Sequence, residues 1–266
     1  MATGAYTVYD NSWHEEHDRL ALLEAWLDPW TTSQLDALGV TTGWSCLEAG
    51  AGGGSIAEWL CTRVDMEGHV LATDIDTRFV GALRHPSLEV QQHDISADEL
   101  PTGRFDLVHA RLLLSHLSSP DVVLTRLIDA VKPGGWLLVE DFAHFTLGFV
   151  DPGQDSDSSR LWQAALTLCL QFMQTRGIEL ELGGRLYRMC RNGGLSDVHA
   201  EGRVTMERGG SIYAAGLMHS FRRLSAIGAM ASLGQDKLDR TLALLMDPEF
   251  GMMSQVFMSV PGQKPG

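Results

Sequence analysis

A glycine-rich segment followed by an acidic residue is the strongest chemical signal in this chain. Residues 47–54 read Leu-Glu-Ala-Gly-Ala-Gly-Gly-Gly, and residues 70–76 read Val-Leu-Ala-Thr-Asp-Ile-Asp. This order predicts a strand, a turn too tight for side chains, a helix, and a second strand that ends at Asp74. Such a turn lets backbone amides approach a ligand, and the carboxylate can accept hydrogen bonds from ribose hydroxyls. The sequence therefore predicts a nucleoside-binding site.

A second pattern with chemical potential is the segment His14-Glu-Glu-His17 near the N-terminus. Its histidines are three positions apart, whereas the His-Glu-x-x-His zinc motif separates them by four. Asp18 and Arg19 follow, which favours a solvated or lid-like helix. We therefore expect no metal site here.

The elements that must position the glycine segment alternate between strands and helices. Strands are expected at residues 46–49, 69–73, 88–91, 105–110 and 136–140. Helices are expected at residues 55–64, 77–83 and 120–131, and a Lys-Pro-Gly-Gly turn at 132–135. This alternation implies a parallel sheet with helices on both faces and right-handed crossovers.

The flanking segments are expected to be mainly helical. Pro29 should divide the first 40 residues into two helices, and the polar residues 151–159 should form a loop. Later helices are expected at 161–175, 183–191, 211–233 and 236–246, and strands at 198–206 and 252–260. We expect four regions in one globular unit: an N-terminal helical lid (1–40), a cofactor-binding Rossmann-like core (41–145), a cap insertion with a helix (146–195), and C-terminal strands with a second helical insertion (196–266).

Four motifs resemble those of class I S-adenosylmethionine-dependent methyltransferases, and more narrowly those of an actinobacterial group that acts on small natural products. They read L-E-x-G-x-G-x-G-S, A-T-D-I-D, F-D-L-V-H-A-R and P-G-G-W-L-x-x-E-D, at residues 47–55, 72–76, 105–111 and 133–141. The resemblance covers residues 40–145 well and the remainder in layout only. It implies an α/β, Rossmann-like fold: a seven-stranded, mostly parallel sheet with an antiparallel last strand and helical cap insertions.

The resemblance also implies S-adenosyl-L-methionine as cofactor and the residues that bind it. Glu48 would order the amino-acid end, and Asp74 would bind the ribose hydroxyls through charge-assisted hydrogen bonds. The other implied cofactor residues are Gly50, Ala51 and Gly52 at the turn, Ile75, Asp94 and Ile95 around the adenine, and Ala110, Arg111 and His116 near the methionine portion.

Methyl transfer from a sulfonium is a direct SN2 displacement, so alignment of the acceptor is the main requirement. A general base helps only where the acceptor must lose a proton. His144, just past the fifth strand, is the expected base, and oxygen is favoured over nitrogen or carbon as the methylated atom. The residues expected to contact substrate are Trp13, Asp141, Tyr213 and His219. The Met- and Leu-rich helical insertions suggest an apolar cavity for a small, apolar molecule.

Composition restricts the partners and the compartment. The chain of 266 residues has 20 basic and 34 acidic side chains, and its net charge of −14 disfavours a nucleic-acid substrate. Four cysteines without a Cys-x-x-Cys pair are typical of a cytoplasmic protein with reduced thiols. We find no leader pattern and no apolar run long enough for a membrane span. We expect a small-molecule substrate, no nucleic-acid or membrane partner, and leave a homo-oligomer open.

Two other functions share part of the pattern. Nicotinamide-dependent oxidoreductases have a similar glycine turn and acid, but Glu48 and the segments 105–111 and 133–141 favour the methyltransferase interpretation. A cofactor-binding protein, or an enzyme with this fold that does not methylate, is the second alternative. Binding of S-adenosylmethionine together with methyl turnover would distinguish the methyltransferase interpretation from both of these alternatives.

Overall fold

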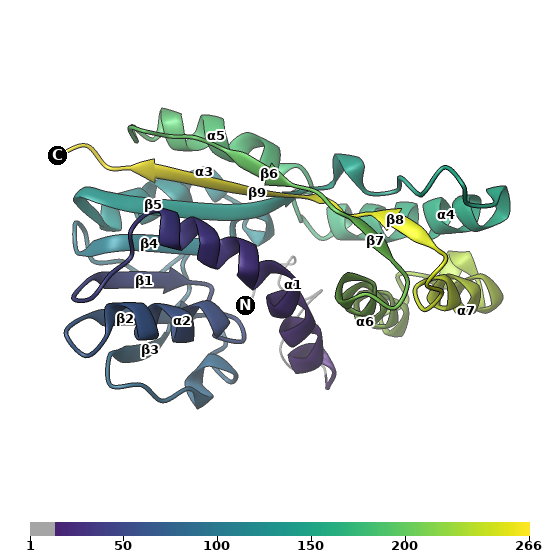
Figure 1. Ribbon diagram of the computed structural model, residues 1–266, viewed down its shortest axis with the longest axis horizontal. Coiled ribbons are helices and arrows are strands. Elements are labelled where there is room, and N and C mark those ends of the chain that lie inside the picture. Colours follow the sequence, from purple (N-terminus) through teal and green to yellow (C-terminus); the bar gives the residue numbers. More distant parts are fainter. Residues whose placement is uncertain (1–13) are drawn as a thin grey trace. The chain divides into compact units, whose positions relative to one another are not determined.

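The computed structural model describes residues 14–266, which divide into two compact units (Figure 1). The first, here called the sheet unit, comprises Leu27–Phe142, Leu182–Gly202 and Phe257–Gly266. The second, the helical unit, comprises Ala143–Glu181, Arg203–Val256 and the described residues up to Trp26. Trp13 lies outside the described residues.

The sheet unit is built on a seven-stranded sheet. In chain order its strands are β1 (Ser45–Ala49), β2 (His69–Asp74), β3 (Leu88–Gln92), β4 (Phe105–Arg111), β5 (Val131–Ala143), β6 (Glu201–Arg203) and β9 (Val256–Gln263). Their order across the sheet is β3-β2-β1-β4-β5-β9-β6, with parallel pairing from β3 through β5. Strand β9 runs in the opposite direction (Figure 1). The predicted fold class is confirmed.

Helices cover both faces of this sheet because its central strands bury side chains on both sides. Helix α2 (Ser55–Val64) and the later part of α1 (Glu16–Ala37) contribute Leu60 and Leu35 to one apolar cluster, which includes Leu107 and Leu138 of the sheet. On the other face, α3 (Pro120–Ala130) and α5 (Leu182–Asn192) form a second cluster with the alternate residues of the same strands.

The helical unit has its own core. It contains a two-stranded sheet of β7 (Met206–Arg208) and β8 (Gly251–Met253). Its helices are α4 (Ser156–Thr175), α6 (Ile212–Ala226) and α7 (Gln235–Leu244). Trp162 lies at the centre of this core, with its ring centroid 5.9 Å from that of Phe221 and 5.7 Å from that of Phe250.

Several local predictions were wrong. Pro29 lies inside α1 instead of dividing it, because burial of the residues that follow, such as Thr31 and Leu35, outweighs one lost backbone hydrogen bond. Residues 77–83 form only a 3-10 turn at Val80–Ala82, since a segment this short cannot stabilise an isolated α-helix. The expected turn at 132–135 belongs to β5, at an irregularity in its register with β4.

The remaining differences concern element ends. Helix α4 begins inside the expected loop because Asp155 caps it, accepting hydrogen bonds from the amides of residues 157 and 158. Helix α6 ends at Ala226, before Gly228 with its φ of +80°, and a separate 3-10 turn occupies Ala231–Leu233. The strands expected at 198–206 and 252–260 each divide into two, β6 with β7 and β8 with β9.

Candidate functional site

The glycine turn connects β1 to α2 at the carboxyl edge of the sheet. Gly50, Gly52 and Gly54 have φ values of +74°, +55° and +100°, which only glycine adopts readily. The amides of Gly50 and Ala51 donate to the Thr73 carbonyl at 2.8 and 3.0 Å, and the Gly52 amide donates to Asp74. These amides therefore have protein acceptors, in contrast to the expectation that they face a ligand. The glycines instead allow the positive φ angles of this turn without a side-chain clash.

Asp74 ends β2 beside this turn. Its Oδ2 accepts from the Gly52 amide at 2.9 Å and its Oδ1 accepts from the Asp76 amide at 3.0 Å. Burial raises the pKa of Asp74 above its usual value, although these backbone hydrogen bonds oppose the rise. Since each carboxylate oxygen has two lone pairs, one on each oxygen can still accept from a neighbouring pair of hydroxyls. This carboxylate therefore has the acceptors that the two hydroxyl groups of a ribose require.

The structure places Asp94 and Ile95 just past the neighbouring strand, β3. Asp74 pairs with Gln92 in the parallel register, and the His93 amide donates to the Asp74 carbonyl at 2.8 Å. The Asp94 carboxylate accepts from the Ser96 amide at 2.9 Å. The chain thus brings two acidic side chains to the ends of the adjacent strands β2 and β3.

A buried triad of ionisable side chains, Glu48, His109 and Glu140, lies on one face of the sheet. His109 Nδ1 is 2.6 Å from Glu48 Oε2, and Nε2 is 3.3 Å from Glu140 Oε2. The three residues are 3%, 0% and 1% exposed, so water cannot stabilise their charges. Burial alone would lower the pKa of His109, but the two carboxylates raise it to about 9. Likewise, His109 holds the pKa of Glu140 below its usual value despite the opposing effect of burial.

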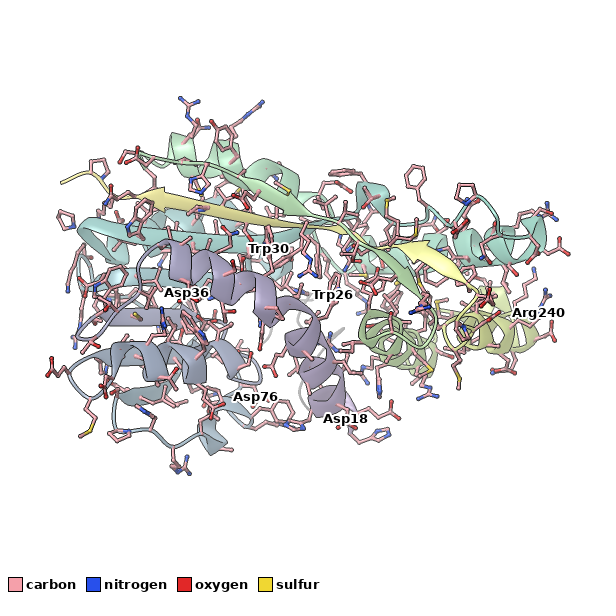
Figure 2. The ribbon with its side chains drawn as sticks, in the orientation of Figure 1. Asp18, Trp26, Trp30, Asp36, Asp76 and Arg240 are labelled. Atoms are coloured by element: carbon pink, nitrogen blue, oxygen red, sulfur yellow. The ribbon has the colours of Figure 1, made fainter. Side chains whose placement is uncertain are left out.

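Hydroxyl groups and an ion pair surround this triad. Thr31 donates to Glu140 Oε2 at 2.6 Å, and Ser259 donates to Glu140 Oε1. Trp30 of α1, which is labelled in Figure 2, in turn donates to the Ser259 hydroxyl at 2.8 Å. The Arg111 guanidinium, expected near the methionine portion, donates to Thr31 at 3.0 Å.

The same guanidinium forms an ion pair with Asp28 of α1. Arg111 Nη2 lies 2.8 Å from Asp28 Oδ1, an oxygen that also accepts from the Ser55 hydroxyl at 3.1 Å. Ser55 is the first residue of α2, so one carboxylate connects α1, β4 and the helix that follows the glycine turn. The guanidinium of Arg111 is therefore engaged by the protein itself.

His109 and Glu140 were not predicted from the sequence motifs as members of a site. His109 interrupts the otherwise apolar run Phe105–Ala110, and a polar residue in a strand buried on both faces is a usable signal. In the parallel register Glu48 pairs with His109, and His109 pairs with Leu138, two residues before Glu140. Residues two apart share a face, which brings the three side chains together.

The other predicted residues of the sheet unit have structural contacts of their own. Asp141 is buried and accepts hydrogen bonds from the amides of Ser115 and Phe142, at 3.0 and 2.9 Å. Ala110 is buried in the core of the α3 and α5 face. His116 lies in the 3-10 turn Leu114–His116 after β4, and Ile75 is half-buried after β2.

Three predicted residues belong to the helical unit. His144 Nδ1 lies 2.6 Å from the Leu180 carbonyl, so this nitrogen donates a proton and the lone pair of a neutral ring is on Nε2. Burial lowers the pKa of His144, which keeps the ring neutral at neutral pH. The buried Tyr213 hydroxyl donates to Gln255 at 2.6 Å, and burial raises its pKa. His219 pairs with Glu15 at 3.0 Å.

A family model described as a methyltransferase domain matches residues 15–199, more than half of the chain. The chain belongs to this methyltransferase family. Its resemblance to class I S-adenosylmethionine-dependent methyltransferases is therefore confirmed. No helix among residues 14–266 is long and apolar enough to cross a membrane, and in these residues no three or more His, Cys, Asp or Glu side chains are arranged so that they could hold a metal ion.

Curated relatives match part of their own length. A ubiquinone biosynthesis O-methyltransferase of Paraburkholderia xenovorans is 31% identical over 42% of this chain and 50% of the relative. Methyltransferase str2 of Strobilurus tenacellus is 37% identical over 36% of this chain and 34% of the relative. The chain thus spans about half the length of such relatives, or less.

Solved structures show the same fold at low identity. The YcgJ protein of Bacillus subtilis has a TM-score of 0.56 and 12% identity, covering 88% of this chain and 97% of that protein. Phosphoethanolamine N-methyltransferase 2 of Haemonchus contortus, solved with S-adenosylhomocysteine, has a TM-score of 0.53 and 16% identity, covering 99% of this chain and 56% of that protein.

Proposed function

We propose that the chain binds S-adenosylmethionine at the carboxyl edge of the sheet unit and transfers its methyl group to a small molecule. Asp74 carries this proposal, because its carboxylate is fixed beside the glycine turn and retains acceptor capacity for a ribose diol. Ile75, Asp94 and Ile95 then contact the adenine, and Glu48 the amino-acid end. Ala110, Arg111 and His116 lie toward the methionine portion.

The bound cofactor supplies a methyl group that its sulfonium has already activated. The residues of this chain then have to fix the nucleoside, exclude water and align the acceptor, a contribution of up to about 7–11 kcal/mol in favourable cases. The buried triad has one negative charge in excess of its positive charge, which suits a cationic ligand. Membership of the methyltransferase family supports this assignment.

The proposed acceptor is small and apolar, and oxygen is the favoured atom. The helical unit supports an apolar acceptor, because methionine, leucine and aromatic side chains dominate its core. The name of the Paraburkholderia relative, an O-methyltransferase, supports oxygen. Asp141, Tyr213 and His219, with Trp13 outside the described residues, are the proposed substrate contacts.

His144 is the proposed general base for an acceptor that must lose a proton. A neutral imidazole with its proton on Nδ1 and its lone pair on Nε2 is the form that a base requires. The lowered pKa of His144 keeps that form present at neutral pH. Tyr213 is a weaker candidate, because burial raises the pKa of its hydroxyl.

Asp74→Ala provides the test of this function. Isothermal titration with S-adenosylhomocysteine should give binding to the wild type and at least about tenfold weaker binding to the variant, since ribose hydroxyls lose a charged acceptor. Asp76→Ala, two positions along the same loop, is the matched control and should bind more nearly like the wild type. Wild-type affinity in Asp74→Ala would refute the ribose assignment. Methyl turnover with labelled cofactor and a panel of phenolic, amine and carbon acceptors would then identify the methylated atom.

A further inference from the structure

The buried triad of Glu48, His109 and Glu140 has a defined charge state. Both ring nitrogens of His109 face carboxylate oxygens, at 2.6 and 3.3 Å. Carboxylates only accept hydrogen bonds, so both nitrogens can donate only if the ring is an imidazolium. Two carboxylates and one imidazolium leave a net charge of −1 in a region that is almost closed to water. The adjacent ion pair of Arg111 and Asp28 is neutral as a whole and does not change this balance.

The two carboxylates of the triad are not equivalent. Both oxygens of Glu140 accept hydrogen bonds from the protein, from Ser259 at Oε1 and from Thr31 and His109 at Oε2. Glu48 accepts from His109 at Oε2, while its Oε1 has no hydrogen-bond partner among residues 14–266. Glu48 is also the residue nearest the glycine turn, two positions before Gly50. The open acceptor of the triad therefore lies on the member nearest the glycine turn.

We propose that His109 is a positioning residue that orients Glu48 for the α-ammonium group of the cofactor. This inference rests on the proposed function. One positive ammonium would balance the single excess charge of the triad and occupy the open oxygen. Without the hydrogen bond from His109 to Oε2, the Glu48 side chain would lose the contact that fixes the direction of its open oxygen. The ammonium would then lose a positioned acceptor.

A purely structural role for His109 would affect the whole nucleoside site equally. The inferred role concerns only the amino-acid end of the ligand. Two nucleosides that differ at this end therefore distinguish the inferred role from a structural one. S-adenosylhomocysteine carries the amino-acid end, whereas 5′-methylthioadenosine has the same adenosine and sulfur but neither the ammonium nor the carboxylate. A change in the ratio of their dissociation constants when His109 is replaced therefore locates the effect at the amino-acid end.

The experiment measures both constants by titration calorimetry for the wild type and for His109→Gln, which keeps a polar side chain but cannot be a cation. We expect S-adenosylhomocysteine to bind about tenfold or more weakly to the variant, the effect of one charge-assisted hydrogen bond, and 5′-methylthioadenosine to change less than about twofold. His69→Gln is the matched control, because His69 also pairs with a glutamate, Glu89, at 3.1 Å, but at the protein surface. It should leave both constants unchanged.

Equal weakening of both nucleosides, or no change in either, would overturn the role of His109 while leaving the proposed function in place. If the wild type binds neither nucleoside, the proposed function itself fails, and this inference with it. Should His109→Gln not fold, nitrogen NMR of histidine-labelled wild type at pH 8 decides. A ring protonated on both nitrogens should then shift with S-adenosylhomocysteine and not with 5′-methylthioadenosine. Absence of such a ring, or equal shifts with both nucleosides, would also overturn it.

Discussion

Raising the pH from about 6.5 to about 8.5 should remove about 2 kcal/mol of folding stability through His109. The folded protein raises the pKa of this residue from 6.5 to about 9, because Glu48 and Glu140 face its two nitrogens. A pKa raised by folding stabilises the protein below the pKa of the unfolded chain, and this stabilisation is lost as the pH rises through the folded value. The full pKa difference of His109 between the unfolded and the folded protein corresponds to about 3 kcal/mol of folding stability.

Urea unfolding followed by circular dichroism across this pH range is the appropriate assay. Wild type should lose stability steadily between about pH 6.5 and 8.5, whereas His109→Gln should be less stable at pH 6.5 and lose less stability over the range. His69→Gln should follow the wild type, since its ion pair with Glu89 is exposed to water. Burial also raises the thiol pKa values of the cysteines, to about 11 for Cys61, so thiols of the unfolded chain ionise first near the upper limit of the range. This contribution is common to all three proteins, and the difference between their profiles therefore reports on His109. Parallel profiles for wild type and His109→Gln would refute the electrostatic reasoning.

Three further outcomes are expected. His144→Ala should slow methyl transfer by about 10²- to 10⁴-fold, with unchanged affinity for S-adenosylhomocysteine; unchanged turnover at saturating acceptor would exclude it as the base. Trp162→Phe should cost less than about 1.5 kcal/mol of unfolding free energy, because the buried indole N–H has no partner among residues 14–266, whereas Trp162→Ala should cost about 3–5. Equal losses of unfolding free energy in Trp162→Phe and Trp162→Ala would contradict this expectation. Gly183→Ala should destabilise by about 1–3 kcal/mol, since a Cβ would lie 2.6 Å from the Asp141 carbonyl oxygen, and Gly184→Ala, where a Cβ meets nothing within 4 Å, is its control in urea unfolding.

The glycine turn and the position of Asp74 beside it could be predicted because their determinants are local in sequence. A glycine turn and the acid at the end of the next strand belong to one strand-helix-strand unit, and their types and spacing follow from short-range geometry. The structure places Asp74 beside the turn, as that geometry requires. It also gives the turn amides protein acceptors, which the pattern of glycines does not reveal.

The buried triad required the tertiary structure because its members are distant in sequence. His109 is 61 residues from Glu48 and 31 from Glu140, and only the register of three neighbouring strands places the side chains on one face. A shift of one residue in any strand would point its member to the opposite face. Likewise, the packing of residues after Pro29 keeps α1 continuous where the local rule predicts a break. Short-range chemistry thus specifies the glycine turn, whereas long-range pairing decides which charges are buried beside it.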